Sequence, residues 1–369
     1  MSIDRRRLLL AAAAGCLVGD VVPAAPMSVE AGRRLAVMRR WPTRDTALTP
    51  LALDGASVAF AGESTLGIIT LTGRGEQPAD TVGLAWQQEH GLSGGAAFRP
   101  RFGGDLVVCG GPAGLAAWEI ATGRPRWRYP ARVQVGVPFV DGQRVYCGDG
   151  HEIVALDLAS GQPLWRFAGT PDTLANYAPA GVGEQLFAGP GDGRLYALSI
   201  ADGTPLWILD RRDDWQYLRQ LHCSGDLLVA GSYQEALYGL EVRDGRERWV
   251  FHAGNFINSH HVADGTAYLW SPTGWIYAIN TQSGQVRWRH RTTDFAGDRR
   301  NWAPLMAELT TWDDLLYALA LDQVVHRLDR ASGKEIDRLR LPEPVQPALL
   351  PSAAGLLFAG TGGDVLLVS

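Results

Sequence analysis

The chain has 369 residues, of which 46% are hydrophobic and 20% charged. This composition is typical of a globular protein and excludes a disordered or collagen-like chain. Its 34 basic and 39 acidic residues give a net charge of −5, which argues against a dedicated nucleic-acid binder. The sequence contains 13 tryptophans, and their spacing is the main clue to its organisation.

Residues 1–25 have the pattern of an export signal. Three arginines, Arg5–Arg7, precede an apolar run that begins at Leu8, and small residues and Pro23 follow. The Arg-Arg-x-Leu-Leu run resembles a twin-arginine signal, which exports folded proteins, although a Sec signal with a basic start has the same layout. No later apolar run approaches the ~18 residues that a membrane-spanning helix needs. We therefore expect the mature protein in the periplasm, or otherwise outside the cytoplasmic membrane.

Lipidation is a second open question at this end of the chain. The run Ala13-Ala14-Gly15-Cys16 resembles a lipoprotein cleavage box, except that alanine stands where leucine is usual. Cleavage before Cys16 removes three positive charges and one negative charge, which makes the net charge −7. Residues 26–32 would then be a linker, and the protein would carry an N-terminal lipid anchor.

Three cysteines, Cys109, Cys147 and Cys223, remain after the signal. An odd number allows at most one internal disulfide, and whether one forms is open. No Cys-x-x-Cys occurs, which excludes c-type haem attachment and a zinc ribbon. The plainer expectation is three small, buried side chains at strand ends.

A β-rich unit of about forty residues recurs along the chain. Its clearest copies are residues 116–127, 154–165, 196–207, 238–249 and 277–288. Each copy ends in a tryptophan, with glycine four residues earlier, a polar residue eight earlier and alanine or glycine ten earlier. The successive units end at Trp41, Trp86, Trp127, Trp165, Trp207, Trp249 and Trp288, and a degenerate copy ends at Ile336.

The pattern has a physical basis. Residues 153–158 alternate in polarity as a strand with two different faces does. The polar residue can bond to nearby backbone and start a turn, and the glycine supplies the positive φ that closes a hairpin. We expect the tryptophan to end the outer strand, where its large ring covers a small alanine or glycine of a neighbouring unit.

The two ends of the chain complement each other. Residues 345–369 contain three strands' worth of sequence, and residues 35–41 supply one unaccompanied strand. Together they make one whole unit, which brings the total to eight. A ring of four-stranded blades leaves no long sheet edges, and joining both termini in one blade locks it. We therefore predict an all-β, eight-bladed β-propeller over residues 33–369, with its last blade closed by the N-terminal strand.

The run Ala-x-Asp-x-x-(Thr/Ser/Asp)-Gly-x-x-x-Trp, nearly intact at 117–127, 155–165 and 197–207, resembles the tryptophan-docking motif of the quinoprotein-type (PQQ-like) propellers. The resemblance covers most of the chain and implies the eight-bladed fold. It says less about function, because one propeller fold hosts many activities. In size, export signal and repeat-only content the chain is most similar to the propeller lipoprotein of the outer-membrane β-barrel assembly machinery.

The chain departs from the PQQ-dependent alcohol dehydrogenases of that family. They are far longer and carry two adjacent cysteines over the quinone, and no adjacent pair occurs here. Their Gly-Asp-Asn stretch with the catalytic aspartate has its nearest match at 297–302, which makes Asp298 a weak catalytic candidate. Asn255 similarly resembles their calcium-binding asparagine. Both stand elsewhere in the repeat, and motif context is what confirms such a role.

Propellers of this architecture usually bind ligands at one end of the central channel, where loops between blades and loops between the second and third strands gather. Loops on a rigid scaffold are where function concentrates. The binding candidates on these loops are Arg99, His151, Asn176, Tyr177, Arg219, Gln220, Tyr233, Asn258, His260, Trp275, Arg300, Asn301 and Trp302. The arginines Arg99 and Arg219 could hold an anionic ligand such as a carboxylated quinone, and Trp275 and Trp302 could stack on a planar ring. For each residue, a solvated loop position or a structural contact is the plainer interpretation.

His260 and His261 look like a metal-binding pair. Adjacent residues of a strand point to opposite faces, so without a bulge the two imidazoles cannot hold one ion. We therefore expect them to be structural.

Two functions fit these observations. The first is a monomeric, non-catalytic scaffold that binds a protein partner of the cell envelope through its channel face or an outer strand, which can accept a peptide strand by backbone pairing. The second is a compact quinoprotein that oxidises an alcohol or sugar with bound PQQ and calcium. Repeat-only content and the absence of a catalytic motif favour the scaffold, because function must be argued from a site.

Overall fold

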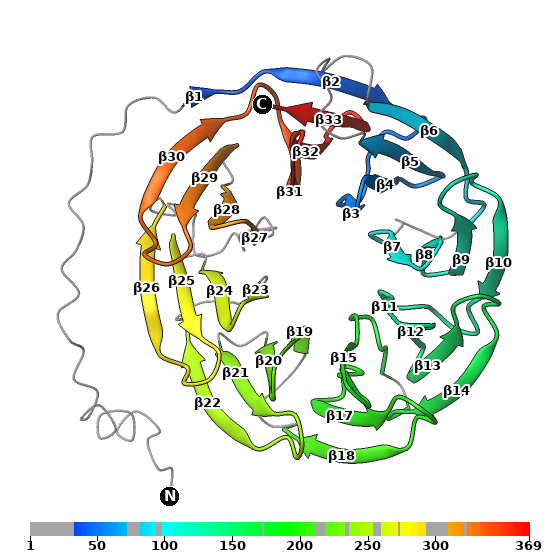
Figure 1. Ribbon diagram of the computed structural model, residues 1–369. Helices are drawn as coiled ribbons and strands as arrows, with labels where there is room; N and C mark the ends of the chain where they lie inside the picture. The colour runs from blue at the N-terminus through cyan, green and yellow to red at the C-terminus, as the bar shows by residue number, and fades with distance from the viewer. Residues whose placement is uncertain are drawn as a thin grey trace, which may run out of the picture. The chain divides into compact units, whose positions relative to one another are not determined.

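The structure is a computed structural model that describes residues 33–71, 82–92, 98–171, 173–211, 218–232, 236–253, 260–271, 274–292, 309–320 and 323–369. The predicted export signal, Cys16 and the linker lie outside these residues. The described strands form eight sheets arranged in a ring, as Figure 1 shows. The predicted eight-bladed β-propeller is therefore confirmed. No helix in the described part of the chain is long and apolar enough to cross a membrane.

Each blade contains four antiparallel strands, and we number the blades from 1 to 8 in the order of their innermost strands. These innermost strands are β3 (Ala52–Asp54), β7 (Arg101–Gly103), β11 (Phe139–Asp141), β15 (Ala180–Val182), β19 (Leu218–Ser224), β23 (His260–Ala263), β27 (Leu309–Trp312) and β31 (Val345–Ser352). The second strands are β4 (Ser57–Ala61), β8 (Leu106–Gly111), β12 (Arg144–Asp149), β16 (Gln185–Ala188), β20 (Leu227–Ser232), β24 (Thr266–Ser271), β28 (Leu315–Leu319) and β32 (Gly355–Gly360).

The outer half of each blade carries the repeat motif. The third strands are β5 (Thr65–Leu71), β9 (Gly114–Glu119), β13 (Glu152–Asp157), β17 (Arg194–Ser199), β21 (Ala236–Glu241), β25 (Trp275–Asn280), β29 (Val324–Asp329) and β33 (Asp364–Val368). The outer strands are β6 (Val82–Glu89), β10 (Pro125–Pro130), β14 (Pro163–Ala168), β18 (Pro205–Asp210), β22 (Glu247–His252), β26 (Val286–Arg291), β30 (Glu335–Arg340) and β2 (Val37–Pro42).

The ring closes through the N-terminus, as predicted. Strand β2 pairs antiparallel with β33, with Trp41 opposite Val365, and so completes blade 8. The sequence did not predict a further short strand, β1 (Arg33–Arg34), which pairs parallel with β30 and adds a fifth strand to blade 7. The N-terminal segment thus binds two neighbouring blades together. The last junction of the ring is therefore formed by strands from opposite ends of the chain. This pairing leaves no open sheet edge at which the ring could separate.

The tryptophans dock between blades. The Nε1–H of Trp127 in blade 2 donates to the carbonyl of Leu158 in blade 3 at 2.7 Å, and the ring lies against Gly161 of the same turn. Gly161 has φ +69°, the left-handed conformation that glycine adopts without strain. The same donor bond joins Trp86 to Ile120, Trp165 to Ile200, Trp207 to Val242, Trp249 to Thr281 and Trp288 to Arg330.

The predicted cover of a small residue in a neighbouring unit is confirmed, because the turn glycine of the next blade lies under the ring. The small residue ten positions before the tryptophan belongs to the same blade, since Ala155 is the cross-strand partner of Trp165. One detail of the prediction needs correction. The tryptophan does not end its strand, because β14 continues from Trp165 to Ala168. The cause is a register shift beside the tryptophan, which lets the strand run on while the indole turns toward the next blade.

The hydrophobic core lies between the blades. One buried cluster combines Leu115 and Trp127 of blade 2 with Val145, Cys147 and Val154 of blade 3. The three described cysteines form no disulfide: Cys109 and Cys147 are buried free thiols and Cys223 is a half-buried one. Burial raises the pKa of the Cys147 thiol to about 12, so this cysteine serves as a small apolar side chain.

The docking contact predicts a specific sensitivity to added volume. A Cβ at Gly161 would lie 2.5 Å from the Trp127 ring, so Gly161→Ala should lower the unfolding free energy by roughly 3 kcal/mol through overpacking and backbone strain. Gly142→Ala is the matched control, because Gly142 has φ +56° with nothing within 4 Å of the added Cβ, and it should cost about 1 kcal/mol. Urea unfolding of both variants measures the difference, and equal losses would show that the docking contact tolerates an extra methyl group.

Candidate functional site

In blade 3, two of the loops that were predicted to contribute to a binding face lie side by side at one end of the blade. In blade 3 the start of β13 pairs with the end of β14, with Glu152 opposite Ala168. The turn that precedes Glu152 therefore lies beside the loop that leaves Ala168 for blade 4. The innermost strands surround the centre of the ring (Figure 1). We call this end of the propeller, with its inner loops, the channel face.

Many of the predicted site residues lie outside the described residues, and their roles stay predictions. These are Tyr233, Asn255, Asn258, Asp298, Arg300, Asn301 and Trp302. Arg219 lies on β19, but its side chain is not described. The described candidates are Arg99, His151, Asn176, Tyr177, Gln220, His260 and Trp275. Of these, Arg99 and Tyr177 are half-buried residues that precede the innermost strands β7 and β15.

Polar candidates on the inner strands and loops contact the next blade. The side chain of Gln220 in blade 5 accepts the backbone N–H of His260 in blade 6 at 2.8 Å. The side chain of Asn176, before blade 4, accepts from Gln134 at 3.2 Å, and its carbonyl accepts the N–H of Val137 at 3.0 Å. These groups therefore join the blades around the channel, which supports the structural interpretation of Asn176 and Gln220.

The two adjacent histidines of β23 point to opposite blades, as predicted from strand geometry. The ring of His260 meets that of His222 in blade 5, with centroids 4.7 Å apart. The Nε2 atom of His261 lies 3.0 Å from the hydroxyl of Thr311 in blade 7. Burial, together with the neighbouring His222, holds the pKa of His260 well below its usual range. His260 is therefore a neutral ring in the packing, and the two residues share no ion.

Trp275 has cationic partners of its own. The guanidinium carbon of Arg289 lies 4.6 Å from the centre of the Trp275 ring, and that of Arg291 lies 5.6 Å from it. Cation–π contacts of this kind hold the ring in place on blade 6. A planar ligand would have to displace arginine side chains to stack on it.

A buried aspartate that the sequence analysis missed organises the channel face near blade 3. The Asp149 carboxylate accepts from the Tyr129 hydroxyl at 2.6 Å and from the backbone N–H of Arg132 and Val133 at 3.0 Å each. Arg166 in turn donates to the Tyr129 hydroxyl at 2.7 Å. The network fixes the loop between blades 2 and 3 against the turn that holds His151. The sequence contained a pattern that could have indicated this residue, since Asp149 lies between two glycines in the turn that holds His151.

Two other blades use an aspartate in the same way. Asp45, which is 8% exposed, accepts the backbone N–H groups of Ser64 and Thr65 at 2.8 and 2.9 Å. Asp192 accepts from the hydroxyls of Thr170 and Tyr196 at 2.7 and 2.8 Å. At these three places buried carboxylates thus hold the loops of the channel face in a fixed arrangement that can serve as a contact surface.

The Asp149 network makes stability depend on pH. Burial raises the pKa of Asp149, but the hydrogen bonds from Tyr129, Val133 and Arg132 outweigh it, so the folded-state pKa lies below the usual value. The carboxylate therefore stabilises the fold above pH ~4 and loses this effect as the pH falls through the folded-state pKa. We expect Asp149→Asn to cost about 2 kcal/mol at pH 7.

The same experiment at pH 3 should show a smaller difference between Asp149→Asn and the parent protein. Denaturant midpoints at both pH values provide the measurement. Asp141→Asn is the control, because this substitution removes the same formal charge and Asp141 is an exposed residue of the same blade. A cost for Asp149→Asn that does not change with pH would contradict a charged role.

Comparison with known proteins agrees with this geometry. A family model described as outer membrane protein assembly factor BamB matches residues 79–214 and 212–348. No curated protein sequence matches the chain. The crystal structure of BamB from Moraxella catarrhalis is similar at a TM-score of 0.65 and 19% identity, covering 91% of this chain and 97% of that one.

Two further solved structures show how widely the fold is shared. The computationally designed protein Ika8 matches at a TM-score of 0.71 and 17% identity, covering 91% of this chain and 99% of that one. The quinohemoprotein alcohol dehydrogenase ADHIIG from Pseudomonas putida HK5 matches at 0.66 and 12%, covering 90% of this chain and 76% of that one. At these identities the likeness concerns the fold alone. The two ranges matched by the family model, in contrast, follow one another without a gap over most of the ring, and the chain therefore belongs to the propeller family described as outer membrane protein assembly factor BamB.

Proposed function

We propose that this protein is a non-catalytic scaffold that works outside the cytoplasmic membrane and holds a protein partner on its channel face. The export pattern of residues 1–25 supports the location. Membership of a family named for an assembly factor supports a binding role. The twin-arginine route and a lipid anchor at Cys16 belong to this proposal as the means by which the scaffold reaches and stays at the membrane.

The observation that carries the proposal is an apolar patch on the channel face. Val133 is 69% exposed, the highest value among the large hydrophobic residues described, and Leu174 is 41% exposed. They lie in the loops that enter blades 3 and 4, and Gly150 touches both loops: it lies close to Val133 and its carbonyl accepts the N–H of Ala175 at 2.8 Å. We call Val133 and Leu174 the loop patch. Exposed apolar groups on neighbouring loops of one face are typical of a protein contact surface.

The loop patch is held in an ordered state. The N–H of Val133 donates to Asp149 at 3.0 Å, the N–H of Val135 donates to the carbonyl of Pro112 at 2.9 Å, and that of Gly150 donates to the carbonyl of Gln134 at 2.8 Å. Binding a partner to a preorganised loop costs less conformational entropy than ordering a free one. Polar neighbours such as Arg132 would form the rim around an apolar centre.

The outer strands offer a second surface. Leu206 and Ile208 on β18 are 50% and 52% exposed, and β18 is the last strand of its sheet. An edge of this kind can accept an extended peptide by backbone pairing. The channel face is the better candidate, because its apolar side chains are presented by loops that the buried carboxylate fixes in place.

Site-specific crosslinking distinguishes these surfaces. A photoreactive amino acid at Val133 in the full chain, expressed in its own envelope, should capture one discrete protein. The same group at Ser160, an exposed residue of the hairpin turn at the other end of blade 3, should not. Capture at Leu206 with none at Val133 would move the contact to the outer strand, and capture at none of these positions would contradict the scaffold.

Charge substitutions provide an independent test of the loop patch. Val133→Asp and Leu174→Asp together should weaken partner retention at least about tenfold, because an apolar interface centre loses more than 1.4 kcal/mol when charged. The melting temperature should change little, since both side chains are exposed. Leu206→Asp is the matched control on the outer strand. Unchanged retention in the double variant would contradict a contact at this patch.

A quinoprotein has weaker support from the described residues, since Trp275 is already stacked on arginines and the described polar side chains of Asn176 and Gln220 bond to neighbouring blades. We expect titration of the mature protein with PQQ and calcium to leave tryptophan fluorescence and the melting temperature unchanged. A ligand that binds the folded state must stabilise it. Saturable quenching with a higher melting temperature would favour the quinoprotein over the scaffold.

A further inference from the structure

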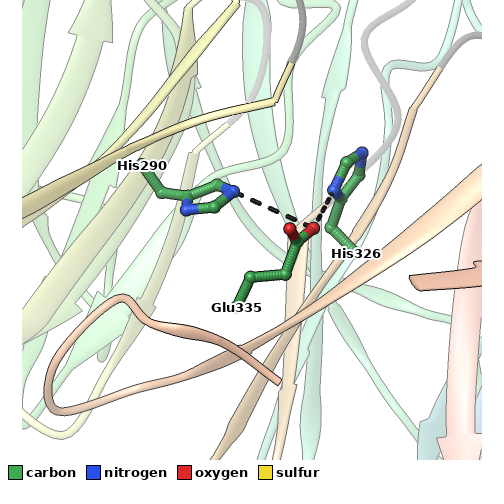
Figure 2. Close-up of side chains that lie close together, drawn as sticks. All are labelled: His290, His326 and Glu335. Carbon is green, nitrogen blue, oxygen red and sulfur yellow. Dashed lines mark hydrogen bonds and ion pairs between the residues drawn. The ribbon is translucent and has the colours of Figure 1, made fainter. Parts of the chain in front are cut away.

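Two histidines and a glutamate meet where the outer part of blade 6 contacts blade 7. His290 comes from β26, His326 from β29 and Glu335 from β30. The Nδ1 atom of His326 lies 2.6 Å from the Glu335 Oε1 atom, and the Nε2 atom of His290 lies 4.0 Å from the same oxygen. Figure 2 shows both imidazoles turned toward this carboxylate. The three ligand atoms lie within 4.8 Å of one another.

The site is sheltered but reachable. The His326 side chain is 1% exposed, while those of His290 and Glu335 are 16% and 21% exposed. The Nε2 atom of His290 is buried and has no hydrogen-bond partner among the described residues. A buried polar atom without a partner is uncommon and calls for an explanation, such as an ion that it would bind.

Two other blade interfaces have an aromatic pair at this position. Two residues beyond its docking tryptophan, blade 3 has Phe167, which meets Tyr196 of blade 4 with ring centroids 5.1 Å apart. Phe251 of blade 5 meets Tyr277 of blade 6 in the same way at 5.2 Å. His290 and His326 occupy these two repeat positions between blades 6 and 7.

The third position also differs from its counterparts at the two aromatic interfaces, although blade 5 has a glutamate, Glu247, at the same place. Two residues beyond the docking glycine, blade 4 has Pro205 and blade 6 has Val286, whereas blade 7 has Glu335. An aromatic pair that the repeat uses at two other interfaces is thus replaced here by two histidines, with a glutamate beside them, and all three groups bind metals. Packing does not require this replacement, because aromatic pairs fill the same place between blades 3 and 4 and between blades 5 and 6.

We propose that His290, His326 and Glu335 form a binding site for a divalent transition-metal ion at the junction of blades 6 and 7. Two imidazoles and one carboxylate are a ligand set that suits zinc, which takes three protein ligands and a water in open sites. The ion would join β26 of one blade to β29 and β30 of the next. It would lie beside the contact of Trp288 with the Arg330 carbonyl and reinforce that junction.

Arg338 affects the affinity of this site for the ion. Its Nε–H donates to the same Glu335 Oε1 atom at 2.8 Å, so in the apo protein the carboxylate is shared by Arg338 and His326. The Arg338 side chain is 23% exposed and can turn to solvent when the ion takes its place. Since a guanidinium repels a cation, Arg338→Gln should bind the metal more tightly than the parent protein.

The test is a titration of the mature full-length protein, first stripped with chelator, with zinc and with cobalt. Calorimetry should show one ion per chain, cobalt should give the visible absorption of a low-symmetry site, and the melting temperature should rise with zinc. Glu335→Gln should weaken binding at least about tenfold, and Arg338→Gln should strengthen it.

A variant with residues taken from another repeat of this chain distinguishes loss of the metal site from misfolding. His290→Phe, His326→Tyr and Glu335→Val together introduce the residues that the preceding interface has at these positions, where Phe251 meets Tyr277. This triple variant should fold, keep a cooperative melt and lose the site. His252→Gln removes an exposed histidine elsewhere and should leave binding unchanged. No binding to the parent protein, or equal binding to the triple variant, would overturn the proposal and leave the cluster as an ion-pair network.

Discussion

The docking of a tryptophan against the next blade is the interaction on which the rest of the structure depends. A single blade cannot bury either of its faces, so its stability comes from its two interfaces. At each described junction from blade 1 to blade 7 the indole N–H donates to a carbonyl of the following blade. The same ring covers the glycine of the turn in which the accepting residue lies. The contact is both apolar and hydrogen-bonded, which fixes the distance and the rotation between blades.

This contact explains why the fold was predictable from the sequence. Its geometry demands a left-handed turn residue with no side chain, a large ring with one donor and a small residue under that ring. Gly161, Trp127 and Ala117 satisfy these demands, and the same residue types recur at fixed spacing. Blade closure was predictable for a related reason, since three strands at one end of the chain need a fourth. The short parallel strand at Arg33–Arg34 was not, because two residues carry no periodic signal.

The candidate sites were harder to predict, because they depend on what faces a residue across a blade interface. Gln220 and His260 are 40 residues apart and belong to different repeats, yet a hydrogen bond joins them across the interface. This bond gives Gln220 a structural role that its place in the sequence does not reveal. Asp149 was missed because it looks like an ordinary turn residue, and its role appears only when Tyr129 and Arg166 converge on it. The spacing of the repeat identifies equivalent positions in different blades. It does not predict which side chains contact one another across a blade interface.

The repeat nevertheless contains functional information when its copies are compared in register. Interface energies in a ring of repeats are nearly additive and act between neighbours. A polar replacement at one junction is therefore tolerated while the docking tryptophans hold the others. Phe167 with Tyr196 and Phe251 with Tyr277 show the apolar form of the contact. The histidines and the glutamate between blades 6 and 7 are its polar form, and burying such groups is unfavourable unless each finds a partner. A propeller can thus gain a binding site at one interface without changing its fold, and the place to look for such a site is where one copy of the repeat departs from the others in several contacting residues at once.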